Sequence, residues 1–175
     1  MPLAAIDLKR DALLAEVGGA GLPPGACRYL HLGMRTANFL FLRDGRPEKG
    51  IDLELGVGTI ADSFFRREIP SEADVENAIN HIEDELQSDP GLVNRSETLL
   101  CADALFAAAF SQQAGTDAAY SRQAVEEAFT RYALVSMGRS PVYDDVRMDR
   151  STYAGILILR EILHHLDFGA VVIRA

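Results

Sequence analysis

The stretch that decides the fold is residues 29–55, which read YLHLGMRTANFLFLRDGRPEKGIDLEL. Three short apolar runs within it, 29–32, 38–42 and 51–55, are typical of strands. The connection 44–50, DGRPEKG, is rich in Asp, Gly and Pro, which favour reversals of the chain. The sequence therefore predicts an antiparallel hairpin between the second and third runs.

Helical patterns surround this hairpin. Apolar residues recur at spacings of three and four, as in an amphipathic helix, in 3–17, 71–86, 118–137 and 151–166. An alanine-rich stretch, 97–113, is apolar on most sides and predicts a core helix. A short helix is expected over 59–68. Ser71 is the expected N-cap of the acidic helix that follows, and the run 169–173 predicts a last strand.

These elements predict an α+β fold, or a mixed α/β variant of it. A small, mainly antiparallel sheet, with hairpin strands near 28–56 and a C-terminal strand near 169–174, is covered by four to five helices. We expect the 175 residues to form a single globular domain. Within it, 1–25 forms an N-terminal helix and a Gly/Pro linker, and 26–175 forms the main body.

Composition excludes several classes of partner. The chain is 48% hydrophobic and 25% charged, which is ordinary for a globular protein, and its formal net charge is −9. Such a charge repels long polyanions, and the sequence contains no basic stripe with interleaved aromatic residues. We therefore expect no binding to nucleic acid and none to an anionic membrane surface.

The expected location is the cytoplasm. No apolar run approaches the roughly 20 residues that cross a bilayer, and residues 1–10 lack the basic and apolar regions of a signal peptide. Cys27 and Cys101 match no metal-binding or redox spacing, so we expect two small buried side chains without a disulfide.

The helix expected over 71–86 is unusually acidic. From 71 to 89 there is no Lys or Arg, and there are seven carboxylates: Glu72, Asp74, Glu76, Glu83, Asp84, Glu85 and Asp89. Glu72, Glu76 and Glu83 fall within one narrow arc of the helix, where like charges repel. A basic partner or a divalent cation would relieve this repulsion, so the three are candidate partner-binding residues. The alternative is a solvated helix face.

The loop 141–150, PVYDDVRMDR, contains the candidate catalytic residues Asp144, Asp145, Asp149 and Arg147. Clustered carboxylates bind hard cations, and an Arg between them could hold a phosphate or carboxylate. The alternative is structural, with Asp149 or Ser151 as the N-cap of the next helix and the other acids in solvent.

The spacing Glu161-x-x-His164 is that of a metal-binding helix, but the helical projection argues against a metal. It places Arg160, Glu161, His164 and His165 away from the apolar face. We therefore expect no metal ligand and no cofactor, with Glu161 instead supporting His165 across one helical turn.

Two further titratable residues leave alternatives open. Asp103 falls among apolar residues on an expected core helix, where it would act as a general acid or base, pair with an Arg, or lie at an exposed rim. His31 alternates away from the leucine face of its strand and would be either a structural histidine or a ligand-binding residue.

The segment 31–38, HLGMRTAN, followed by an apolar strand and Asp44-Gly45, resembles the first phosphate-binding hairpin of actin-like ATPases and exopolyphosphatases. The resemblance implies that Gly33, Thr36 and Asn38 hold a phosphate. It also marks a difference, because His31 stands where those families have a metal-linked acid. The chain is shorter than the two lobes of those families.

The sequence contains no nucleophile elbow, Walker loop, zincin helix or dinucleotide fingerprint. The leading hypothesis is therefore a non-catalytic cytoplasmic domain that binds a protein partner or self-associates as a homo-oligomer. The alternative is a small hydrolase, or an enzyme that binds a phosphate or nucleotide ligand. It would use the turn 33–38 or the carboxylates of the loop.

Overall fold

The computed structural model describes residues 22, 24–93, 98–102, 104–110, 117–144 and 149–174. The strands are β1 (Ala26–Leu32), β2 (Ala37–Arg43), β3 (Arg46–Leu53), β4 (Thr98–Cys101), β5 (Ala118–Ser121) and β6 (Ala170–Ile173). The helices are α2 (Val57–Ser63), α3 (Glu72–Gln87), α4 (Ala104–Ala109), α5 (Arg122–Ser136) and α6 (Arg150–His165), with 3₁₀ turns η1 (Pro90–Leu92) and η2 (Pro141–Asp144).

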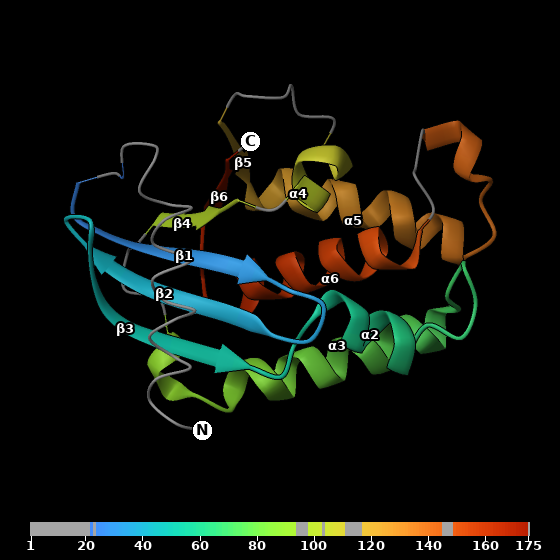
Figure 1. The fold of residues 1–175 in the computed structure, drawn as a ribbon. Helices are drawn as coiled ribbons and strands as arrows, with labels where there is room; N and C mark the ends of the chain where they lie inside the picture. The colour runs from blue at the N-terminus through green and yellow to red at the C-terminus, as the bar shows by residue number, and fades with distance from the viewer. Residues whose placement is uncertain are drawn as a thin grey trace.

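The strands form one mixed sheet in the order β3-β2-β1-β4-β6-β5 (Figure 1). β1, β2 and β3 are antiparallel neighbours, β4 and β6 run parallel to β1, and β5 is antiparallel to β6. The predicted α+β fold is confirmed. The C-terminal strand joins the sheet as expected, but β4 separates it from the hairpin strands.

The turn between β2 and β3 is tighter than the sequence indicated. Asp44 and Gly45 have φ values of 49° and 75°, as in the two-residue turn that matches the twist of a hairpin. β3 therefore begins at Arg46, so the rest of the predicted connection belongs to the strand. Pro47 is tolerated there because β3 is an edge strand.

Two predicted helices contain strands instead. The stretch expected to be one core helix over 97–113 holds β4, and Leu99, Leu100 and Cys101 are all buried at the centre of the sheet. A central parallel strand is apolar on both faces, so it lacks the alternation that marks a strand. Likewise 118–121 forms β5, and Ser121 caps α5 by accepting from the backbone N–H of Ala124 at 3.1 Å.

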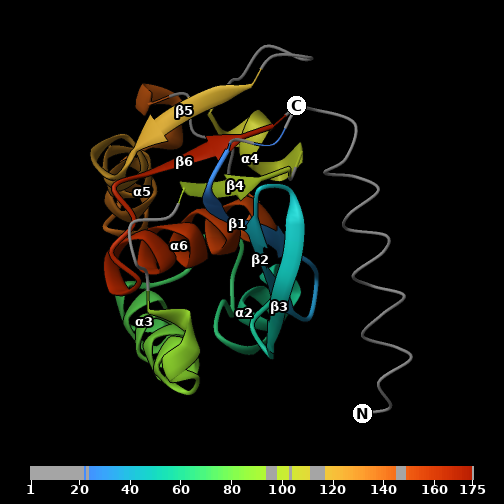
Figure 2. The ribbon, with the colours of Figure 1, turned by 90° about the vertical axis from the view of Figure 1, so that its left-hand side faces the viewer.

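α6 is the central helix of the core. It lies between α3 and α5 on one side of the sheet, and almost every residue from Thr152 to Leu163 is buried (Figures 1 and 2). A smaller apolar cluster covers the other face of the sheet and includes Cys27, Tyr29 and Leu40. Cys27 and Cys101 are both buried and form no disulfide, as predicted.

α3 begins where the sequence placed it. The Ser71 side chain accepts from the backbone N–H of Asp74, and the Asp74 carboxylate accepts from the backbone N–H of Ser71 at 3.0 Å. This is a reciprocal capping box. Among the described residues, no helix has both the length and the apolar character needed to span a bilayer.

Candidate functional site

The carboxyl ends of the parallel strands meet at one edge of the sheet. β1, β4 and β6 run in the same direction, so the turn 33–36 after β1 and Arg174 after β6 lie at that edge. In open sheets with parallel strands, ligands bind outside these carboxyl ends. This edge of the sheet is therefore the candidate ligand site.

The turn between β1 and β2 is closed and fixed by hydrogen bonds. The backbone N–H of Gly33 donates to Thr36 O at 2.9 Å, and the N–H groups of Val57 and Thr59 donate to Gly33 O and Met34 O at 3.0 and 3.1 Å. The Thr59 hydroxyl donates to Arg35 O at 3.3 Å. All four carbonyl oxygens of the turn are thus used by the turn itself or by the start of α2.

Two glycines permit this close approach. A Cβ atom on Gly56 would lie 2.4 Å from the carbonyl of Met34 and from the backbone nitrogen of Arg35. A Cβ atom on Gly58 would lie 2.8 Å from Met34 O. Local sequence signals do not link these glycines to the turn, because the contact joins segments more than twenty residues apart.

The side chains of the turn differ in exposure. Met34 and Arg35 are exposed, whereas His31 and Thr36 are half-buried. Asn38 is buried and donates from its side-chain amide to Asp52 Oδ1 at 2.6 Å, which links β2 to β3. Of the residues that the phosphate-hairpin resemblance named, Gly33 and Thr36 lie in the turn, and Asn38 lies inside the sheet.

His31 and Arg174 lie on the same face of the sheet. Leu30, Cys101 and Ile173 are in register across β1, β4 and β6, so His31 and Arg174 follow at the same level, two strands apart. Two strand spacings amount to about 10 Å. Arg174 was not among the predicted site residues, and neither was Asp117, whose Oδ2 lies 3.5 Å from Arg174 Nε. Each of the two residues adjoins a strand. Arg174 follows β6, which was predicted, and Asp117 precedes β5, which was not.

The predicted catalytic loop is described only in part. Asp145 and Arg147 lie outside the described residues, as does Asp103, and Asp144 is described only as part of the backbone of η2. Asp149 is the N-cap of α6 and accepts from the backbone N–H of Thr152 at 2.7 Å and from its hydroxyl. Asp149 therefore lies where the alternative interpretation placed it, at the N-cap of the helix.

The acidic arc of α3 divides between two places. Glu72 and Glu76 are exposed and border a groove of about 320 Å³ between α3 and α5, lined also by Phe129 and Tyr153. Burial raises the pKa of the Tyr153 hydroxyl, although a hydrogen bond with Ser136 opposes the shift.

Glu83 turns instead toward α6, where its Oε1 lies 3.0 Å from His165 Nε2. The prediction that Glu161 points away from the core is wrong, because only 1% of its side chain is exposed. The helical projection considered α6 alone, whereas the packed neighbouring helices cover this side of it. The prediction that Glu161 supports His165 is confirmed, since Glu161 Oε2 lies 3.3 Å from His165 Nε2.

No protein-family model matches this chain, and no curated protein matches it. Solved structures do match. An Aquifex aeolicus Ppx/GppA enzyme superposes with a TM-score of 0.70 at 15% identity, over 87% of this chain and 54% of that one. An exopolyphosphatase from Cytophaga hutchinsonii gives 0.66 at 13% identity, over 89% and 55%. An exopolyphosphatase-like protein gives 0.66 at 9% identity, over 86% and 56%.

The chain shares the fold of these enzymes. At such low identity the likeness shows the fold alone, and the chain spans about half the length of the structures it matches. The prediction of a protein-binding domain with a protein partner or a second copy is overturned by these neighbours, which are named as phosphatase-type enzymes. The alternative, an enzyme that acts on phosphate ligands, is the better supported of the two hypotheses.

Proposed function

We propose that this chain provides a phosphate-binding unit of a phosphatase-type enzyme, with the turn 33–36 as the phosphate site. The observation that carries the proposal is the orientation of the turn. Its four carbonyl oxygens accept hydrogen bonds from the turn and from α2, so their negative ends face the protein. An anion at the other side of the turn then meets less repulsion, at the edge of the sheet where ligands bind.

The side chains give each residue a role. Arg35 is exposed on the turn, and its guanidinium can bind two phosphate oxygens at once. The Thr36 hydroxyl is the second donor, and His31 and Arg174 add cationic or donor groups at the same edge. The start of α2 positions the turn through Thr59, Gly56 and Gly58, and none of these three residues contacts the phosphate.

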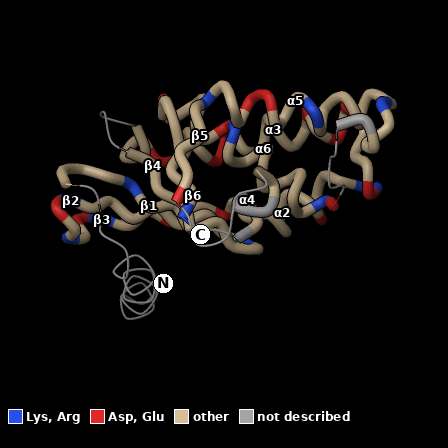
Figure 3. Tube along the Cα trace, turned by 90° about the horizontal axis from the view of Figure 1, so that it is seen from above, with Lys and Arg blue, Asp and Glu red and all other residues tan. Residues whose placement is uncertain are grey.

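The charge of the molecule bears on substrate size. The formal net charge is −9, and Figure 3 shows Lys and Arg interspersed with Asp and Glu along the described chain. Long polyphosphate would experience this repulsion over many charges, whereas a short phosphate compound presents only a few. We therefore expect short phosphate anions to be preferred over long polyphosphate.

The test is phosphate release by the full chain from tripolyphosphate and from long-chain polyphosphate. Arg35→Ala and Thr36→Val should each lower kcat/KM about tenfold or more, because a hydrogen bond to a charged group contributes about 1.5–3 kcal/mol. Thr130→Val is the matched control, since its hydroxyl donates to Glu126 O on α5, away from the sheet edge. Equal activity in all four proteins, or none in any, would contradict the proposal.

A further inference from the structure

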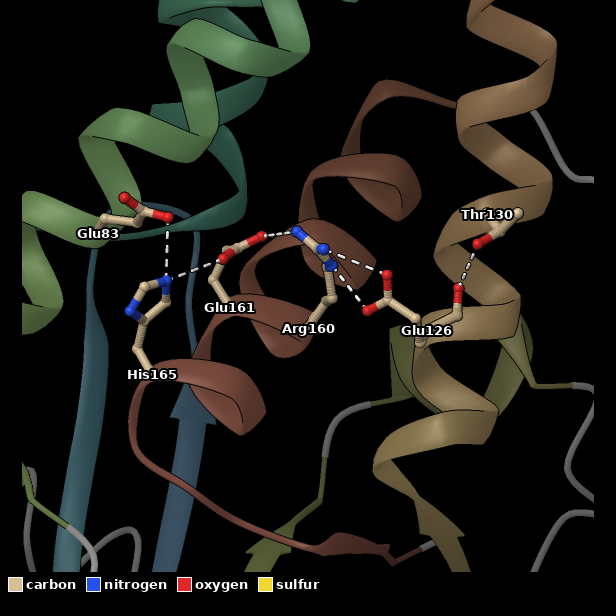
Figure 4. A network of polar contacts seen from close by, with 6 residues as sticks. All are labelled: Glu83, Glu126, Thr130, Arg160, Glu161 and His165. Atoms are coloured by element: carbon tan, nitrogen blue, oxygen red, sulfur yellow. Dashed lines mark hydrogen bonds and ion pairs between the residues drawn. The ribbon is translucent and has the colours of Figure 1, made fainter.

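Three metal-ligating side chains converge between α3 and α6. Figure 4 shows Glu83 reaching from α3 toward His165 near the end of α6, with Glu161 one turn earlier on the same helix. His165 Nε2 lies 3.0 Å from Glu83 Oε1 and 3.3 Å from Glu161 Oε2, and one ligand atom from each residue lies within 4.8 Å of the others.

A single linear hydrogen bond can satisfy only one of the two carboxylates that face His165. An imidazole nitrogen carries at most one hydrogen, whether the ring is neutral or charged. Two carboxylate oxygens nevertheless point at the same nitrogen, Nε2 of His165, at similar distances. One hydrogen must be shared between them, or one oxygen faces a nitrogen without a hydrogen to offer it.

The distances fit a coordination shell. Zinc binds His nitrogen and Glu oxygen at about 2.0–2.2 Å, so neighbouring ligand atoms lie about 3.3–3.6 Å apart in a tetrahedral site and about 2.8–3.1 Å apart in an octahedral one. The two contacts of His165 Nε2, at 3.0 and 3.3 Å, fall within the span of these two geometries. One imidazole nitrogen with two carboxylates suits zinc and similar transition ions better than Mg²⁺ or Ca²⁺, which prefer oxygen alone.

Charge also favours a cation here. Glu83, Glu161 and Glu126 contribute three negative charges, and Arg160 contributes one positive charge. Glu161 is buried, where an excess of negative charge is costly. A divalent ion between the three ligand atoms would balance the cluster.

The outer groups are already arranged to support such a site. Arg160 donates to the second oxygen of Glu161, leaving Oε2 directed at His165. Arg160 is itself held by both oxygens of Glu126, at 2.8 and 3.1 Å (Figure 4). Burial alone would lower the pKa of Arg160, but the bonds to Glu126 and the charge of Glu161 raise it overall. Partners of this kind orient the ligands of metal sites.

We propose that Glu83, Glu161 and His165 bind a divalent transition ion of the zinc type, which links α3 to α6. The site is separate from the turn 33–36. The part of α6 that faces α2 includes Gly155, which is ten residues, or about 15 Å, from His165 along the helix axis. Glu83 and His165 are partly exposed, so an ion can reach the site from solvent.

The test is zinc titration of the untagged, chelator-treated full chain by isothermal calorimetry. We expect one zinc per chain. Glu83→Gln and His165→Ala should weaken binding about tenfold or more, because mutating even an outer partner of a metal ligand typically costs about 10- to 100-fold in metal affinity. Glu83→Gln preserves shape at a partly exposed position and so should fold. His164→Ala is the matched control, because this exposed neighbour lies outside the cluster.

A second measurement separates binding from folding. Zinc should raise the thermal unfolding midpoint of the wild type and of His164→Ala, because an ion bound only to the folded state stabilises it. At the same zinc concentration it should raise that of Glu83→Gln by clearly less. The proposal is overturned if no stoichiometric binding occurs, or if Glu83→Gln and His165→Ala bind zinc as tightly as the wild type.

Discussion

At the scale of single residues, Gly56 is the position where the turn 33–36 and α2 depend most on a missing side chain. Gly56→Ala would place a Cβ atom 2.4 Å from the backbone of Met34 and Arg35, so backbone must move. We expect the free energy of unfolding to fall by about 1–3 kcal/mol in a urea titration.

Gly169→Ala is the control for that experiment. A Cβ atom there meets nothing within 4 Å, and the residue does not have a positive φ. Its free energy of unfolding should stay within about 0.5 kcal/mol of the wild type. If the two variants were equally stable, the close seating of the turn on α2 would be wrong.

Asp149 makes a second residue-scale prediction. Its carboxylate caps α6 through the backbone N–H and the hydroxyl of Thr152. Asp149→Ala should lower the free energy of unfolding by about 1 kcal/mol, the usual effect of losing an N-cap. If Asp149 were catalytic as well, the variant would lose most of its phosphate release from tripolyphosphate at temperatures where it remains folded. Thermal unfolding and phosphate release measured on the same variant distinguish the two.

At the scale of elements, the capping box of α3 should be sensitive to acid. Hydrogen bonds from the side chain and backbone of Ser71 hold the pKa of Asp74 below its ordinary value of 3.8. Because the pKa is lower in the folded than in the unfolded chain, the charged carboxylate stabilises the fold above 3.8. This contribution is lost as the pH falls through the folded-state pKa.

The corresponding variant is Asp74→Asn. Its free energy of unfolding should lie below that of the wild type at neutral pH, and the difference should shrink as the pH falls below 3.8. Denaturant titrations of both proteins across the acid range measure it. A difference that is constant with pH would show that the charge of Asp74 does not stabilise the cap.

The elements also show what sequence reasoning could reach. Local signals sufficed to predict a hairpin at the connection 44–50, though not its two-residue turn, and to predict the cap at Ser71, because each depends on residues close in the chain. β4 and β5 were missed because their strand character comes from the neighbours they pair with in the sheet. Glu161 was misplaced for a similar reason, since its burial results from packing between elements.

At the scale of the whole molecule, the candidate site also depends on contacts between segments that are far apart in the chain, which local sequence signals do not reveal. The sequence singled out Gly33 and Thr36, and the structure places both in a turn held by α2. It could not place Arg174 at the same edge of the sheet as that turn, because this placement requires the strand order β1-β4-β6. The segment 31–38 suggested a resemblance to exopolyphosphatases in the sequence, but a shared fold over 87–89% of this chain in two solved structures was visible only in three dimensions.

The central claim is that the turn 33–36 binds phosphate, and amide chemical shifts measured during titration with inorganic phosphate test it most directly. We expect saturable shifts concentrated at Gly33, Met34, Arg35 and Thr36, and strongly weakened shifts in Arg35→Ala. Thr130→Val should behave as the wild type does. Phosphate binding by the turn would be ruled out if no shift saturates. It would also be ruled out if the shifts spread over basic residues elsewhere and leave the turn unaffected.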